Sequence, residues 1–245
     1  MRHGLRRRIC GGLSVAALLL LAACAGTPPL PGRQAVPQQA DQGSFGQLGK
    51  SDFDRMADIE MRENTQSLRT LMIKLYKRNP RELRKSSSGS AEQMAAQLFN
   101  AQQDWKLPQL GGLQGIAAIQ QAFQPGWQGD RVLSLIVGLQ TMLIQAHGGK
   151  TEFYLADDLD PQRIYNAARN IEIAVWKLSN ARDEQGRLYL LTNEQNDGAH
   201  NLSFEREFGE MIGRLDLLAL ALSEKTQRFI TQVVQTMASA LFLPL

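Results

Sequence analysis

The stretch RVLSLIVGLQTMLIQAHGG, residues 131–149, contains no Lys, Arg, Asp or Glu from position 132 to position 147. As a helix it is apolar on nearly every side, and a helix without a polar face has to be buried all round. Asp130 stands at the expected N-cap, and Gly148 with Gly149 is a usual helix stop. We therefore expect this helix at the centre of a domain, with other helices packed around it.

The segments before it carry helix-start signals as well. Ser51, with Asp54 three residues later, resembles a capping box. The helix that follows should end or bend at Pro80, because the residue before a proline avoids the α region. Ser90 should cap a second helix that runs to about Phe99. A short amphipathic helix is expected within 113–123, with one face formed by Leu113, Ile116, Ala117, Gln120 and Phe123.

Helical spacing continues after the central stretch. Asp160 followed by Pro161 is a typical helix start, since proline is favoured at the first helical position. Two apolar stripes follow at gaps of mostly three and four residues, Ile164, Ala168, Ile171, Val175 and Leu178, then Phe204, Phe208, Met211, Leu215, Leu218 and Leu222. The second stripe resumes at Phe229, Val233, Met237 and Leu241, as a further helix or after a bend. Gly186 predicts a turn, which allows one short β-hairpin near 181–191. The fold class is all-α, a single multi-helix domain over 51–245.

The first residues have a different character. The basic opening MRHGLRRRIC precedes the apolar GGLSVAALLLLAA, and Leu21-Ala22-Ala23-Cys24 ends that run. This order of charge, apolar run, small residues and cysteine resembles the signal peptide and lipobox of bacterial lipoproteins. The resemblance covers residues 1–24 and implies cleavage after Ala23, a diacylglycerol thioether on Cys24, and a fatty acyl chain such as palmitate on the new amino terminus. An ordinary cleaved signal peptide is the alternative.

The same resemblance predicts domains and location. Residues 1–23 would be a cleaved signal peptide, and 24–50 the lipidated cysteine followed by a flexible linker rich in Pro, Gly and Gln. In lipoproteins an Asp after the cysteine favours the inner membrane, whereas here Ala25 follows. We expect an outer-membrane protein, lipid-anchored, with the domain facing the periplasm.

The positive charge of the whole chain belongs to the signal. Of its 27 Lys and Arg residues, four lie within 1–23, whereas none of the 24 Asp and Glu residues does. The remaining chain would be nearly neutral, so its composition gives no reason to expect nucleic-acid binding.

One basic cluster stands out within the domain. It consists of Lys74, Lys77, Arg78, Arg81, Arg84 and Lys85, with Glu82 the only acid among them. If the helix continued through Pro80, four of these cations would share a face able to contact lipid A phosphates or anionic head groups. The alternative is a solvated helix end whose cations offset the helix dipole.

The sequence offers no motif for catalysis. The chain has no Glu-Ser pair of the kind found in peptidoglycan-cleaving transglycosylases and no Gly-x-Ser-x-Gly. Outside the signal the histidines are His147 and His200, which stand apart from other ligands, so we expect no metal and no cofactor. The stretch ADDLDP, 156–161, is interpreted as a cap and turn, with an open carboxylate site as the alternative.

These observations favour a non-catalytic binding, scaffolding or assembly factor of the cell envelope, with the membrane as one partner and an envelope protein as another. Two alternatives stay open, and the sequence does not indicate an oligomeric state. A peptidoglycan-active enzyme of unrecognised family would have a deep polar cleft with a partly buried Glu or Asp. A carrier of an apolar ligand would have a dry cavity between the helices around 132–147.

Overall fold

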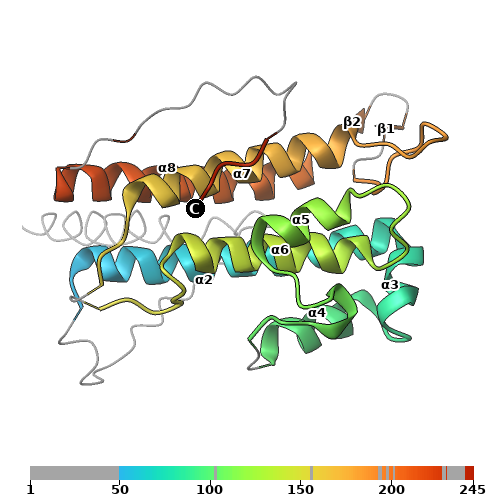
Figure 1. Ribbon diagram of the computed structural model, residues 1–245, viewed down its shortest axis with the longest axis horizontal. Helices are drawn as coiled ribbons and strands as arrows, with labels where there is room; N and C mark the ends of the chain where they lie inside the picture. The colour runs from blue at the N-terminus through green and yellow to red at the C-terminus, as the bar shows by residue number, and fades with distance from the viewer. Residues whose placement is uncertain are drawn as a thin grey trace, which may run out of the picture. The chain divides into compact units, whose positions relative to one another are not determined.

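A computed structural model describes residues 50–101, 104–154, 157–192, 195–196, 199–200, 202–227, 230 and 241–245. This part of the chain is all-α, as predicted. Its four long helices are α2 (Asp52–Arg78), α6 (Arg131–Ala146), α7 (Pro161–Asn180) and α8 (Ser203–Thr226). They form a ring in which α2 contacts α6, α6 contacts α7, α7 contacts α8, and α8 returns to α2 (Figure 1).

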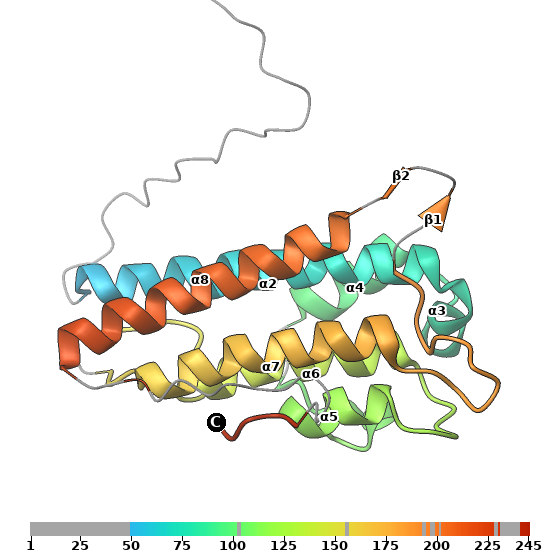
Figure 2. The same ribbon diagram turned by 90° about the horizontal axis from the view of Figure 1, so that it is seen from above.

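Neighbouring helices in this ring run in opposite directions (Figure 2). The end of α2 meets the start of α8, where Lys74 Nζ donates to the Ser203 carbonyl at 2.9 Å. The start of α2 meets the end of α8, where Lys225 Nζ lies 4.5 Å from the centroid of the Phe53 ring. The fold is an up-down-up-down four-helix bundle.

The predicted ends of α2 are confirmed. Ser51 and Asp54 form a complete capping box, with the Ser51 amide 2.6 Å from an Asp54 carboxylate oxygen. The helix ends at Arg78, and α3 (Pro80–Ser86) begins at Pro80. Proline stands there at the first helical position, where its missing N–H costs nothing.

The long connection from α2 to α6 covers the outside of the bundle. It comprises α3, α4 (Ala91–Asn100), a 3₁₀ turn η2 (Pro108–Leu110) and α5 (Gly115–Ala122). The predicted Ser90 cap of α4 is confirmed, since Ser90 Oγ accepts from the Gln93 amide at 3.2 Å. α4 packs on α2, whereas α3 and α5 pack on α6.

The predicted buried face of α5 is wrong. Its fully buried residues are Ala118, Ile119 and Ala122, whereas Ala117 and Gln120 are exposed. The reason is the close approach of α5 to α6 at Gly138, where an added Cβ would lie 2.6 Å from the Ile119 backbone nitrogen. Such close packing favours small side chains at the contact. A pattern of apolar residues does not show where two helices approach this closely. Of the other residues assigned to that face, Leu113 is exposed, Ile116 is half-buried and Phe123 is buried.

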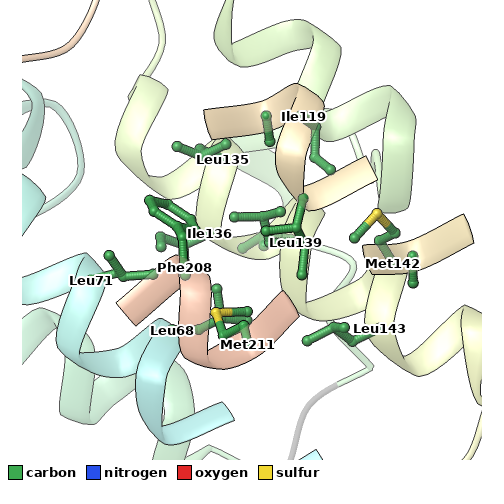
Figure 3. Close-up of a cluster of buried hydrophobic side chains, with 14 of the residues drawn as sticks. Leu68, Leu71, Ile119, Leu135, Ile136, Leu139, Met142, Leu143, Phe208 and Met211 are labelled. Carbon is green, nitrogen blue, oxygen red and sulfur yellow. The ribbon is translucent and has the colours of Figure 1, made fainter. Parts of the chain in front are cut away.

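The central position of α6 is confirmed. Fourteen of its sixteen residues are buried, so the helix has no solvent face. Leu135, Ile136 and Leu139 meet Leu68 and Leu71 of α2 and Phe208 and Met211 of α8 (Figure 3). The helix stops at Gly148 and Gly149, whose positive φ angles of 72° and 82° suit glycine.

The last two helices follow their predicted stripes. Asp160 caps α7 by accepting from the Gln162 amide at 2.9 Å, and Val175 is the one half-buried residue of the α7 stripe. All six predicted positions of α8 are buried. Phe229, Val233 and Met237 lie outside the described residues, whereas Leu241 belongs to a non-helical segment, 241–245.

Extended structure in the described residues is slight. The hairpin anticipated near 181–191 consists of a single antiparallel bridge between Arg182 and Leu188, with Gly186 at φ 75° in its turn. The strands β1 (Gln195–Asn196) and β2 (Ala199–His200) pair antiparallel over two residues each. Among the helices that the structure describes, none is both long enough and apolar enough to cross a bilayer.

Candidate functional site

The six cations of the basic cluster do not share one helix face, because α2 ends at Arg78 and α3 starts a new axis at Pro80. Lys74 points to the start of α8, where its Nζ lies 3.5 Å from a Glu207 carboxylate oxygen. Lys77 forms an ion pair of 2.6 Å with Glu92 of α4. These two lysines connect α2 to its neighbouring helices.

The other four cations lie around the α2–α3 junction. Arg78 Nε donates to the Thr192 carbonyl at 3.1 Å, and Lys85 Nζ contacts a Glu82 carboxylate oxygen at 2.6 Å. Arg81 and Arg84 are exposed and have no hydrogen bond or ion pair with another described residue. Contact of this cluster with an anionic surface remains a prediction.

A cleft of about 740 Å³, lined by both charged and apolar residues, opens at this end of the bundle. It lies between the α2–α3 junction, the turn that precedes α6, and the segment around 183–191. Its charged lining consists of Arg78, Arg81, Lys85, Arg131 and Arg187 against Glu82, Asp183 and Glu184. Three residues of the predicted cluster therefore line the cleft together with two cations from distant parts of the chain, and cations outnumber acids.

Arg131 holds the wall of the cleft in place. Its guanidinium donates to the carbonyls of Ala122 at 2.7 Å, Gln124 at 3.1 Å and Trp127 at 2.8 Å. The same group lies 4.2 Å from the centroid of the Tyr189 ring, which joins the 183–191 segment to the turn before α6. Burial lowers the pKa of Arg131, and the charge of Glu82 opposes that effect. With three carbonyl partners, Arg131 is a structural residue rather than a free ligand.

The role of this arginine was not predicted from the sequence. Arg131 begins α6, directly before the uncharged run, and it was not considered as a site residue. Its signal is weak, because an arginine at the start of a helix is usually solvated, and its carbonyl partners cannot be identified from a linear pattern.

Two buried carboxylates secure the start of α6, Glu82 in the lining of the cleft and Asp130 at the N-cap of the helix. Glu82 accepts from the Arg131 amide at 2.7 Å with one oxygen and from Lys85 with the other. Asp130 accepts from the Leu133 amide at 3.0 Å and from the Tyr76 hydroxyl at 2.7 Å. Burial raises the pKa of Asp130, and burial together with the charge of Asp130 raises the pKa of Tyr76. The two carboxylates thereby satisfy two of the free N–H groups at the helix start, those of Arg131 and Leu133.

A second buried polar cluster lies inside the bundle, between α2 and the end of α6. His147 Nδ1 lies 2.8 Å from the Leu143 carbonyl, which it can contact only as a donor. Its Nε2 faces a Glu60 carboxylate oxygen at 2.8 Å, and neither atom has another partner among the described residues. One proton between these two atoms satisfies both. Asn64 donates to the other Glu60 oxygen and accepts from Arg214 at 3.0 Å, which explains a polar residue on the buried stripe of α2.

The remaining polar residues singled out in the sequence have local roles. Asp157 accepts from the Tyr154 amide at 2.9 Å and pairs with Lys150, and Asp160 caps α7, so the cap-and-turn interpretation of 156–161 is confirmed at these two positions. The described residues contain no group of three His, Cys, Asp or Glu side chains arranged to hold a metal. Cys24 and the side chain of His200 lie outside what the structure describes.

The two alternative functions, a peptidoglycan-active enzyme and a carrier of an apolar ligand, can be compared with the described residues. The cleft does contain a buried acid, Glu82, as the enzyme alternative requires, but both of its oxygens accept hydrogen bonds from Arg131 and Lys85. The apolar side chains of α6 pack against those of its neighbours in one buried cluster, and a cavity for an apolar ligand stays a hypothesis. Comparison of the chain with protein-family models, curated proteins and solved structures found no match. The function is therefore argued from the residues of this chain.

Proposed function

We propose that this protein is an outer-membrane lipoprotein, anchored through Cys24, that acts as a non-catalytic binding or scaffolding factor in the cell envelope. The observation that carries the proposal is that the buried acid of the cleft is fully hydrogen-bonded while one of its cations has no hydrogen bond with a described residue. Its buried acid, Glu82, is committed to the start of α6 and to Lys85, whereas the exposed cation Arg81 has no described partner. Such a cleft suits the binding of an acidic segment better than proton transfer.

The anchor and the linker supply the mechanism. As a coil, the 26 residues from 25 to 50 would have an r.m.s. span of roughly 30 Å. Tethering keeps the domain at about this average distance from the membrane and raises its local concentration near an envelope protein. The cleft would then bind acidic side chains of that partner, with specificity from its aromatic residues Trp127 and Tyr189.

The test is a pull-down from crosslinked cells with four versions of the full chain. These are the unaltered protein, Cys24→Ala with a cleavable signal, Arg81→Glu, and Arg84→Glu as the matched control. Arg81 and Arg84 are both exposed on α3, but only Arg81 lines the cleft. We expect the same envelope protein with the unaltered chain and with Arg84→Glu, and at least a fivefold loss with Arg81→Glu and with Cys24→Ala.

Equal recovery with Arg81→Glu would show that the cleft is not the binding site. Enrichment of lipid A or phospholipid without a protein would refute the scaffolding role and favour contact of the basic cluster with anionic head groups. Equal recovery with Cys24→Ala would refute the tethering mechanism.

A peptidoglycan-active enzyme is the second candidate, because Glu82 is buried at the cleft. If the protein is such an enzyme, the purified protein should release soluble glycan fragments from peptidoglycan. Glu82→Gln should then stop this release while the protein stays folded. Absence of release by the unaltered protein would eliminate this candidate.

A further inference from the structure

Residues 241–245, with the sequence LFLPL, lie along α7 (Figure 2). The segment is non-helical and is held against α7 by hydrogen bonds from two asparagines of that helix. It runs opposite to the helix, since Phe242 lies near Lys177 whereas Pro244 meets Asn166. The contact is therefore that of a peptide lying on a helix.

The asparagines contact the backbone of the segment. Asn170 Oδ1 accepts from the Leu243 amide at 2.6 Å, and its Nδ2 donates to the Leu243 carbonyl at 2.9 Å. One side chain thus pairs with both polar groups of one residue, as the opposite residue of an antiparallel strand would. One turn away, Asn166 Nδ2 donates to the Pro244 carbonyl at 2.8 Å, and Gln162 Nε2 donates to Asn166 Oδ1 at 2.8 Å, which orients the amide.

Two apolar side chains of the segment anchor it. Phe242 and Leu245, three residues apart, are partly buried and pack against the core. Leu241 and Pro244 are exposed, with 71 % of Leu241 accessible. We call the part of α7 that carries Asn166 and Asn170 and holds this segment the groove. The groove holds apolar side chains at two positions and contacts the main chain between them.

Asn170 bonds the segment rather than its own helix. Its side chain is fully buried within α7, yet its polar atoms pair with a residue 73 positions away rather than with its own helix. A buried amide without partners is costly, and asparagine is a poor helix former, so local structure does not account for it. Because the bonds go to main-chain atoms, any extended segment with suitable apolar anchors can make them.

We propose that the groove marked by Asn166 and Asn170 is a peptide-docking site, and that segment 241–245 is a tethered occupant which an extended segment of a partner protein can replace. The replacing segment carries apolar side chains at the positions of Phe242 and Leu245. It also offers a free N–H at the position of Leu243. An incoming segment competes with an occupant on the same chain, whose effective concentration is on the order of mM. This inference does not depend on the cleft.

The test measures binding of a fluorescent peptide, Ala-Leu-Phe-Leu-Pro-Leu, to the full chain by anisotropy. The double variant Phe242→Asp, Leu245→Asp clears the groove. We expect it to bind the peptide at least tenfold more tightly than the unaltered chain, which holds its own segment. Adding Asn170→Ala to the cleared variant should weaken binding at least tenfold. The matched control adds Asn180→Ala, an exposed asparagine of α7 that bonds only within its helix, and should leave binding unchanged.

A change in the peptide distinguishes recognition of its main chain from nonspecific apolar binding. N-methylation at the position of Leu243 removes the N–H and should weaken binding at least tenfold, whereas alanine there should change it less than threefold. Circular dichroism checks the fold of each variant, and the milder Phe242→Ala replaces the double variant if that one does not fold. The proposal is overturned if a folded, cleared variant does not bind the peptide. Equal binding by the Asn170→Ala variant or by the methylated peptide would also overturn it.

Discussion

Gly138 is where the packing of α5 on α6 can be tested most directly. A Cβ added there would lie 2.6 Å from the Ile119 backbone nitrogen and 2.7 Å from Ile119 Cγ1. Ordinary contact begins at 3.4 Å, so α5 would have to move outward by about 0.8 Å. The nearest atom belongs to the backbone, which cannot rotate away as a side chain can.

The expected cost follows from this displacement. Overpacking of a core costs about 1–3 kcal/mol. Moving α5 also strains two buried hydrogen bonds, from the Gly115 amide to Thr141 and from Ser134 to the Ala118 carbonyl, each worth about 1 kcal/mol. Against this, alanine gains about 1 kcal/mol over glycine in helix propensity. We expect Gly138→Ala to lower the free energy of unfolding by about 2 kcal/mol.

Urea unfolding followed by circular dichroism measures this change, and an unaltered m-value would show that the folded state has not changed in compactness. Gly209→Ala and Gly213→Ala are the controls. Both glycines lie on the exposed side of α8, and an added Cβ there has no atom within 4 Å. These two variants should be stabilised by about 0.5–1 kcal/mol. If Gly138→Ala were stabilised to the same extent, the close crossing of α5 and α6 would be refuted.

Three further predictions concern buried polar groups and a helix cap. Burial raises the pKa of Asp130, so the folded protein binds the carboxyl proton more tightly than the unfolded chain does. The free energy of unfolding should therefore fall as the pH rises from 3.8 through the raised pKa. Asp130→Asn should flatten that fall, as urea titrations at a series of pH values would measure. His147→Leu should cost about 3 kcal/mol, because it leaves one oxygen of the buried Glu60 carboxylate without a partner while Asn64 still holds the other. The double change with Glu60→Leu should cost less, as a double-mutant cycle would measure. Ser90→Ala should cost about 1 kcal/mol and speed amide exchange in the first turn of α4, and unchanged exchange there would contradict the capping role.

The sequence predicted those features that depend on near neighbours in the chain. A capping box joins residues three apart, as with Ser51 and Asp54, and a proline ends the preceding helix within two residues, as at Pro80. The burial of α6 could be predicted because a helix that is apolar on nearly every side is unfavourable in water. The buried face of α5 was not, since it depends on the space left at Gly138 rather than on apolar spacing.

The candidate sites were predicted only in part. The basic cluster supplied three residues of the cleft, but Arg131 and Arg187 join them only because the turn before α6 and the 183–191 segment fold onto the α2–α3 junction. Asn170 lies between the apolar positions that predicted the buried stripe of α7 and was not singled out in the sequence, because its partner Leu243 is 73 positions away.

The sequence by itself therefore determined where several of the helices begin and which of them is central, and it carries the resemblance of residues 1–24 to a lipoprotein signal. Only the tertiary structure decided the order of helices around the ring, the cleft, and the groove on α7. The physical reason is the separation along the chain of the residues that interact. Capping and periodicity act over about four residues, whereas a cleft or a groove is made by side chains that meet only after distant segments have packed.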